Sequence, residues 1–122
     1  MVTAYRHDGM SRWDNLSKLG QLLVQYRIKN GNLTNEDFAK GARIERTSFS
    51  KIIHGERGLY NLDTWVMITK VLIAGKNGRR AIASEIQLNK FFYDVMHLPY
   101  SPLNSERVEY IREQLRELGI PY

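Results

Sequence analysis

The stretch TNEDFAKGARIERTSFSKIIHGER, residues 34–57, decides the fold of this chain. Thr34 is a favourable N-cap, because its hydroxyl can accept a hydrogen bond from a free backbone N–H in the first helical turn. Asp37, three residues later, makes a near match to the capping box. The pattern therefore predicts a short helix that ends at about Gly41, a turn, and a second helix that stops near Gly55.

The apolar residues of this stretch indicate that its two helices share one core. Ala39 is small enough to let the helices cross closely, Ile44 fills the turn, and Phe49 anchors the second helix. The rest of the second helix must then face outward. These outward residues are Arg46, Thr47, Ser48, Lys51 and His54. Short polar side chains can approach base edges and basic ones can reach phosphate or guanine, so this face is a candidate nucleic-acid site.

The residues on either side of this stretch also predict helices. Apolar residues at helical spacing over 16–26 predict a helix that the Asn-Gly-Asn of 30–32 ends. Asn61 or Asp63 can cap another helix downstream. Its expected inner face consists of Trp65, Ile68, Val71 and Leu72.

The C-terminal part begins at a break over 75–78, which carries two glycines. Beyond it, a longer helix is predicted over 81–96. Ser105 is expected to cap a last helix that stops at Gly119. Because strand signals are weak throughout, we expect an all-α fold.

The composition is that of a globular domain, with 122 residues, of which 43% are hydrophobic and 25% charged. The net charge of +5 and the pI of about 9.6 suit a polyanionic partner. Neither a signal peptide nor an apolar run of membrane-spanning length is apparent, so a cytoplasmic protein without membrane attachment is expected.

Signatures of catalysis are weak. The sequence has no cysteine, and the three histidines do not form an H-E-x-x-H pair. The run Gly75-Lys-Asn-Gly lacks the upstream glycine and the Ser/Thr of a phosphate-binding P-loop. No Gly-x-Ser-x-Gly elbow occurs. We therefore expect no enzyme, no metal site and no cofactor.

Four pieces of the sequence stand in order along 19–72: TNEDFA, RIERTSFS, KIIHGER and NLDTWVMITKVL. In this order and spacing they resemble the Cro/Xre-type, lambda-repressor-like helix-turn-helix family of DNA-binding domains. The resemblance implies a lambda-repressor-like helix-turn-helix bundle with a C-terminal helical extension. It also implies that the third helix enters the major groove of double-stranded DNA.

The resemblance implies a role for each residue of the site. Arg46, Thr47, Ser48 and Lys51 would face the groove, and Asn35 stands where the family often has a glutamine that touches phosphate. Arg57 and the loop 55–61 would contact the DNA backbone at the flank, whereas His54 is expected to close the helix rather than read a base. The full DNA-binding set is Asn35, Arg43, Glu45, Arg46, Thr47, Ser48, Lys51, His54 and Arg57.

Two residues depart from the family pattern. Arg43 stands at the family's turn glycine, where a left-handed conformation would cost a non-glycine residue about 1 kcal/mol. Either the turn differs, or Gly41 moves the break earlier. Glu45 suits the helix dipole but repels phosphate, and it could accept from a cytosine amino group. A plain N-terminal helix charge is the favoured interpretation of Glu45.

Three regions are expected: a tail over 1–15, the helix-turn-helix domain over 16–75, and a C-terminal helical extension over 79–122. The tail could instead lie along the duplex as an arm, with Tyr5, Arg6 and Arg12. The last helix carries an a/d stripe two heptads long, predicted as the dimer interface: Val108, Ile111, Leu115 and Leu118. The alternative is packing within the chain against Ile82, Ile86, Phe92 or Met96.

We therefore expect a sequence-specific DNA-binding transcriptional regulator, a repressor in preference to an activator, of bacterial or phage type. It would bind a two-fold symmetric operator as a homodimer and could have a protein antagonist or antirepressor. The alternative is a protein-interaction module that uses the same fold, antitoxin-like or antirepressor-binding. The polar and basic face of 45–54 favours DNA over that alternative.

Overall fold

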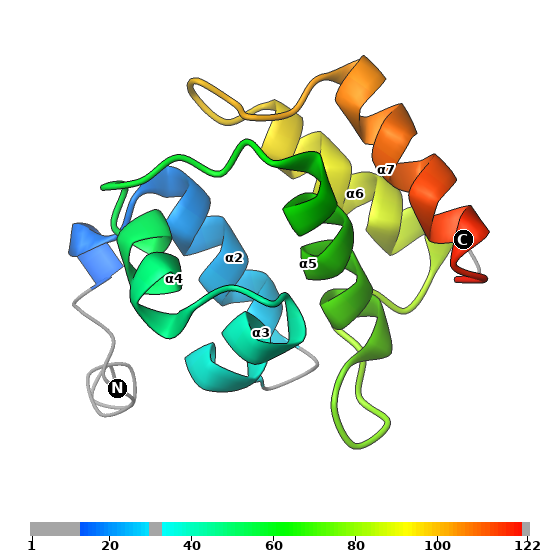
Figure 1. Ribbon diagram of the computed structural model, residues 1–122, viewed down its shortest axis with the longest axis horizontal. Helices are drawn as coiled ribbons and strands as arrows, with labels where there is room; N and C mark the ends of the chain where they lie inside the picture. The colour runs from blue at the N-terminus through cyan, green and yellow to red at the C-terminus, as the bar shows by residue number, and fades with distance from the viewer. Residues whose placement is uncertain (1–12, 30–32, 121–122) are drawn as a thin grey trace.

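The computed structural model describes residues 13–29 and 33–120, and over these residues the chain is helical (Figure 1). The predicted all-α class is confirmed. The elements are η1 (Trp13–Asn15), a 3-10 turn, then α2 (Lys18–Lys29), α3 (Asn35–Gly41), α4 (Arg46–Ile53), α5 (Leu62–Ala74), α6 (Glu85–Met96) and α7 (Ser105–Glu117). In Figure 1, α5 lies at the centre, with α2, α3 and α4 on one side and α6 and α7 on the other. The tail predicted over 1–15 lies mostly in 1–12, outside the described residues.

The start of α3 is the capping box that the sequence predicts. The Thr34 hydroxyl accepts a hydrogen bond from the Asp37 amide at 3.0 Å, and the Asp37 carboxylate accepts one from the Thr34 amide at 3.4 Å. Two otherwise unpaired N–H groups are satisfied in this way. Lys76 also reaches Asp37, at 2.7 Å. The predicted boundaries of α3 and α4 are both confirmed.

The end of α4 is fastened to the start of α2. The amide and the hydroxyl of Ser17 both donate to the backbone oxygen of Ile53, at 2.9 and 3.1 Å. Gly20 lies at the same contact, where a Cβ would come within 2.0 Å of that oxygen. A side chain at position 20 would therefore push α2 and α4 apart, and glycine permits their close approach.

The turn between α3 and α4 is built on Arg43. Its φ of 58° is left-handed, its amide donates to Lys40 at 3.1 Å, and the Ile44 amide donates to Ala39 at 2.8 Å. These are the two bonds of a Schellman motif, whose left-handed residue is usually glycine. The structure thus takes neither predicted alternative, because Arg43 itself adopts the strained conformation. Gly41 instead serves a close contact, since a Cβ there would lie 2.7 Å from the Val71 side chain.

The two C-terminal helices begin at other residues than predicted, α6 later and α7 one residue earlier. Asn61 caps α5 as expected, but α6 begins at Glu85 behind the cap Ser84, not at Ala81. The Ile82 amide donates to the Leu72 oxygen at 3.0 Å, which holds the bent, non-helical 81–84 segment against α5. Asn104, not Ser105, caps α7, because the Asn104 side chain accepts from the amide of residue 107 at 2.9 Å.

The structure corrects the prediction that the apolar stripe on α7 is a dimer interface. Val108, Ile111 and Leu115 are buried within their own chain, where α7 packs on α5. They are therefore covered already and do not offer an intermolecular seam. Packing within the chain is thus right for these three residues, although the helix that α7 packs on, α5, was not among the expected partners. Leu118 is 54% exposed. Of the expected packing partners, Ile82 and Phe92 are buried, whereas Ile86 is 80% exposed.

Candidate nucleic-acid interface

One face of α4 is anchored in the core, and this leaves the opposite face open. Phe49, Ile52 and Ile53 are buried, and the Phe49 ring lies 5.3 Å from the ring of Phe38 on α3. Because residues three and four apart share a face of a helix, these apolar anchors fix which side chains point outward.

The open face carries polar and basic side chains. Arg46, Thr47 and Lys51 are exposed, and Ser48 is half-buried. Ser50 is exposed as well, although the sequence reasoning did not select it. Ser50 lies one helical turn after Arg46 and Thr47, so helical spacing alone would have predicted that it shares their exposed face. The face therefore presents two cations and three hydroxyls, all of which can donate hydrogen bonds.

Arg57 joins this face from the following loop. Its guanidinium donates to the Ser48 hydroxyl at 2.7 Å, across nine residues of chain. The loop leaves α4 at Gly55, whose φ of 79° is left-handed, and His54 caps the helix with its ring nitrogen Nδ1 2.7 Å from the Ser50 oxygen. Arg57 thus belongs to the same surface as the predicted residues Ser48 and Lys51. Arg46 and Thr47 lie beside them.

Asn35 and Glu45 lie at helix N-termini. Glu45 is the N-cap residue of α4, is exposed, and makes no side-chain capping bond. Its negative charge stands near the positive end of the helix dipole, as a plain helix charge would. Asn35 opens α3 and is half-buried, and its side-chain oxygen makes no hydrogen bond with any described residue. A bracing bond from Asn35 to α4 is therefore absent among the described residues.

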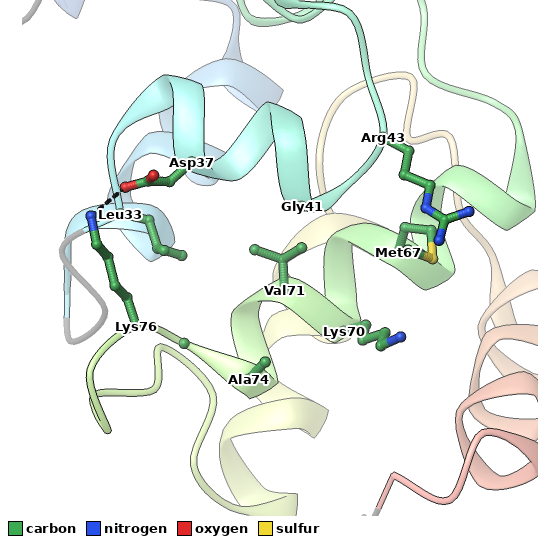
Figure 2. Close-up of a pocket in the computed structure, with 10 residues that line it drawn as sticks. Leu33, Asp37, Gly41, Arg43, Met67, Lys70, Val71, Ala74 and Lys76 are labelled. Carbon is green, nitrogen blue, oxygen red and sulfur yellow. Dashed lines mark hydrogen bonds and ion pairs between the residues drawn. The ribbon is translucent and has the colours of Figure 1, made fainter.

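Arg43 lies on a different surface from the other predicted residues. It lines a groove of about 460 Å³ between α3 and α5, where its side chain extends beside Met67, and Lys70 lines the same groove further along α5 (Figure 2). No residue of α4 lines this groove. The structure therefore groups Arg43 with Lys70 and Lys76, away from the open face of α4.

Other kinds of site receive no support in the part of the chain that the structure describes. There, no three His, Asp or Glu side chains gather as metal ligands would. No described helix is both long and apolar enough to cross a membrane.

Comparison with known proteins found no family model, no curated protein and no solved structure that matches this chain.

Proposed function

We propose that this chain is a sequence-specific DNA-binding regulator of the helix-turn-helix type, whose α4 reads the major groove. The observation that carries the proposal is the open face of α4, where Arg46, Thr47 and Lys51 are exposed on a helix anchored from behind by Phe49 and Ile52. A rigid helix with short polar and basic side chains on its free face suits the major groove, which admits an α-helix.

The mechanism follows from the chemistry of these groups. Lysine and arginine neutralise phosphates and release counterions, so the affinity should fall steeply as salt rises. Arg46 and Lys51 can also donate to guanine, and Thr47 and Ser50 can donate or accept at either base of a pair. Arg57, held by the Ser48 hydroxyl at 2.7 Å, is suited to a phosphate at the flank.

The regulatory role is part of the proposal. A homodimer on a two-fold symmetric operator would read two half-sites about one helical turn apart. Occupation of promoter DNA would then repress transcription. The dimer would not use the buried stripe of α7, so another surface must supply the contact.

The test is selection of bound sites from a random duplex pool, followed by titration of the winning duplex with the wild type and with Thr47→Ala/Lys51→Ala. The expected result is a palindromic site whose recognition is lost or relaxed in the double variant. Weak, salt-sensitive binding without any enriched site would overturn the proposal, because the positive charge would then act alone.

A second candidate is a protein-interaction module on the same fold. It is favoured by exposed apolar side chains on α6 and the loop after it, where Ile86 is 80%, Tyr93 57% and Tyr100 98% exposed. Large exposed apolar groups of this kind are typical of protein contacts when they gather. Binding of a protein partner by a variant that no longer binds DNA would favour this candidate.

A further inference from the structure

The groove between α3 and α5 combines an apolar floor with a cationic rim (Figure 2). The rim cations are Arg43, Lys70 and Lys76, and Asp37 is the one acid that lines the groove. Lys76 is paired with Asp37 at 2.7 Å, but Arg43 and Lys70 make no ion pair with another described residue. The apolar lining is Leu33, Met67, Val71 and Ala74. Such a groove suits an amphipathic surface that carries negative charge.

The strained turn places one of these cations. Arg43 holds a left-handed backbone at a position where glycine would carry no strain, and its side chain extends over the groove beside Met67 (Figure 2). Strained residues of this kind persist where the surrounding structure determines them, and they cluster at functional sites. The guanidinium at the rim is therefore a second reason, independent of the shape of the groove, to regard it as a binding surface.

The matching anionic surface lies on the same chain, on the outer side of α7. Four exposed glutamates follow one another at spacings of three, four and four residues, on the face opposite the buried Val108, Ile111 and Leu115. None of the four makes an ion pair with another described residue. Like charges at such spacings destabilise a helix. The exposed Arg116, three residues after Glu113, offsets part of that repulsion, and a cationic partner would relieve the rest. These residues, the acidic face, are Glu106, Glu109, Glu113 and Glu117.

The acidic face cannot serve the groove of its own chain. The apolar side of α7 packs on α5, and the four glutamates on the opposite side of α7 are exposed, so they face away from the body of the molecule. Tyr110, beside the glutamates, is 39% exposed and can contact an apolar floor.

We propose that the groove between α3 and α5 docks the acidic face of α7 from a second copy of this chain. In a two-fold dimer, the groove of each copy would take the α7 of the other, so that two identical contacts form. The inference rests on the homodimer of the proposed function and gives that dimer its surface.

The test is a charge exchange measured by sedimentation equilibrium. Lys70→Glu places negative charge in the groove, and Glu113→Lys places positive charge at the middle of the acidic face. Each variant alone brings like charges together at both contacts, so self-association should weaken at least about tenfold, which corresponds to roughly 1.4 kcal/mol. An equimolar mixture of the two should associate again, because both contacts then join opposite charges. Lys29→Glu, a reversal of an exposed lysine on α2, is the control and should associate as the wild type does.

Three results would overturn the inference. The wild-type chain could be monomeric at about 100 µM, well above the Kd of a stable dimer. Self-association could be unchanged in both variants, or an equimolar mixture of the two variants could fail to restore it. Circular dichroism of each variant establishes that it is folded.

A failure of DNA binding can be told apart from a failure of the docking surface. If each variant associates weakly and the mixture associates again, but selection enriches no DNA site, the proposed function fails and the docking surface stands. If selection enriches a palindromic DNA site but neither Lys70→Glu nor Glu113→Lys weakens self-association, the docking surface fails and the proposed function stands.

Discussion

Replacing Arg43 by glycine should make the protein more stable, although the change removes a long side chain. Arg43 has a φ of 58° and occupies the left-handed position of the turn after α3. Because this region brings a Cβ too close to the following carbonyl, a non-glycine residue is strained there. Glycine has no Cβ and adopts the same conformation without that strain.

The expected size of the effect follows from two opposing contributions. The left-handed backbone costs arginine roughly 1–2 kcal/mol. Glycine loses more conformational freedom on folding, which costs roughly 0.5–1 kcal/mol. The difference leaves Arg43→Gly more stable by about 0.5–1 kcal/mol, or roughly 2–5 °C in Tm for a domain of this size.

Urea unfolding of Arg43→Gly and of Arg43→Ala separates the backbone from the side chain. Both variants lose the guanidinium, so whatever the guanidinium contributes to stability cancels in the comparison. Alanine keeps the Cβ and therefore keeps the strain, so the glycine variant should be the more stable of the two by about 0.5–1 kcal/mol. Equal stabilities for the two variants would refute the reasoning.

Three further predictions concern stability. Gly20→Ala should cost about 3 kcal/mol in urea unfolding, because the new Cβ would lie 2.0 Å from the Ile53 oxygen; a cost near zero would contradict the close contact. Asn61→Ala should lower Tm through a loss of about 1 kcal/mol, since its side chain caps α5. Burial, with a hydrogen bond to Asp94, raises the pKa of Tyr26. The unfolded chain therefore loses that proton first, and stability falls as pH rises above about 10. Tyr26→Phe should flatten that alkaline loss, and an unchanged pH profile would count against it.

The boundaries of α3 and α4 could be predicted because local chemistry decides them. Thr34 and Asp37 satisfy each other's backbone groups, and Gly55 takes the left-handed position that ends α4. The core face was also predictable, since Phe49 and Trp65 stand at helical spacing from other apolar residues and are buried. These features depend on neighbours within a few positions of the chain.

The features that escaped prediction depend on contacts between distant residues. Ala81 and Ile82 look helical, but a bond from the Ile82 amide to the Leu72 oxygen holds them against α5 instead. The stripe of α7 has the spacing of an intermolecular seam, and α5 covers it within the chain because both helices need an apolar partner. Arg43 could not be assigned to its groove, since that groove exists only where α3 meets α5.

The measurement that tests the proposed α4 interface most directly compares two single arginine removals on the selected duplex by fluorescence anisotropy. Arg46→Ala takes a cation from the open face of α4, and Arg116→Ala takes one from the exposed side of α7. If α4 reads the groove, Arg46→Ala should lose about 1–3 kcal/mol of binding free energy and discriminate less between the selected and a scrambled site. Arg116→Ala should retain that discrimination. Equal losses for the two variants, with discrimination unchanged in both, would contradict a DNA-reading role for α4.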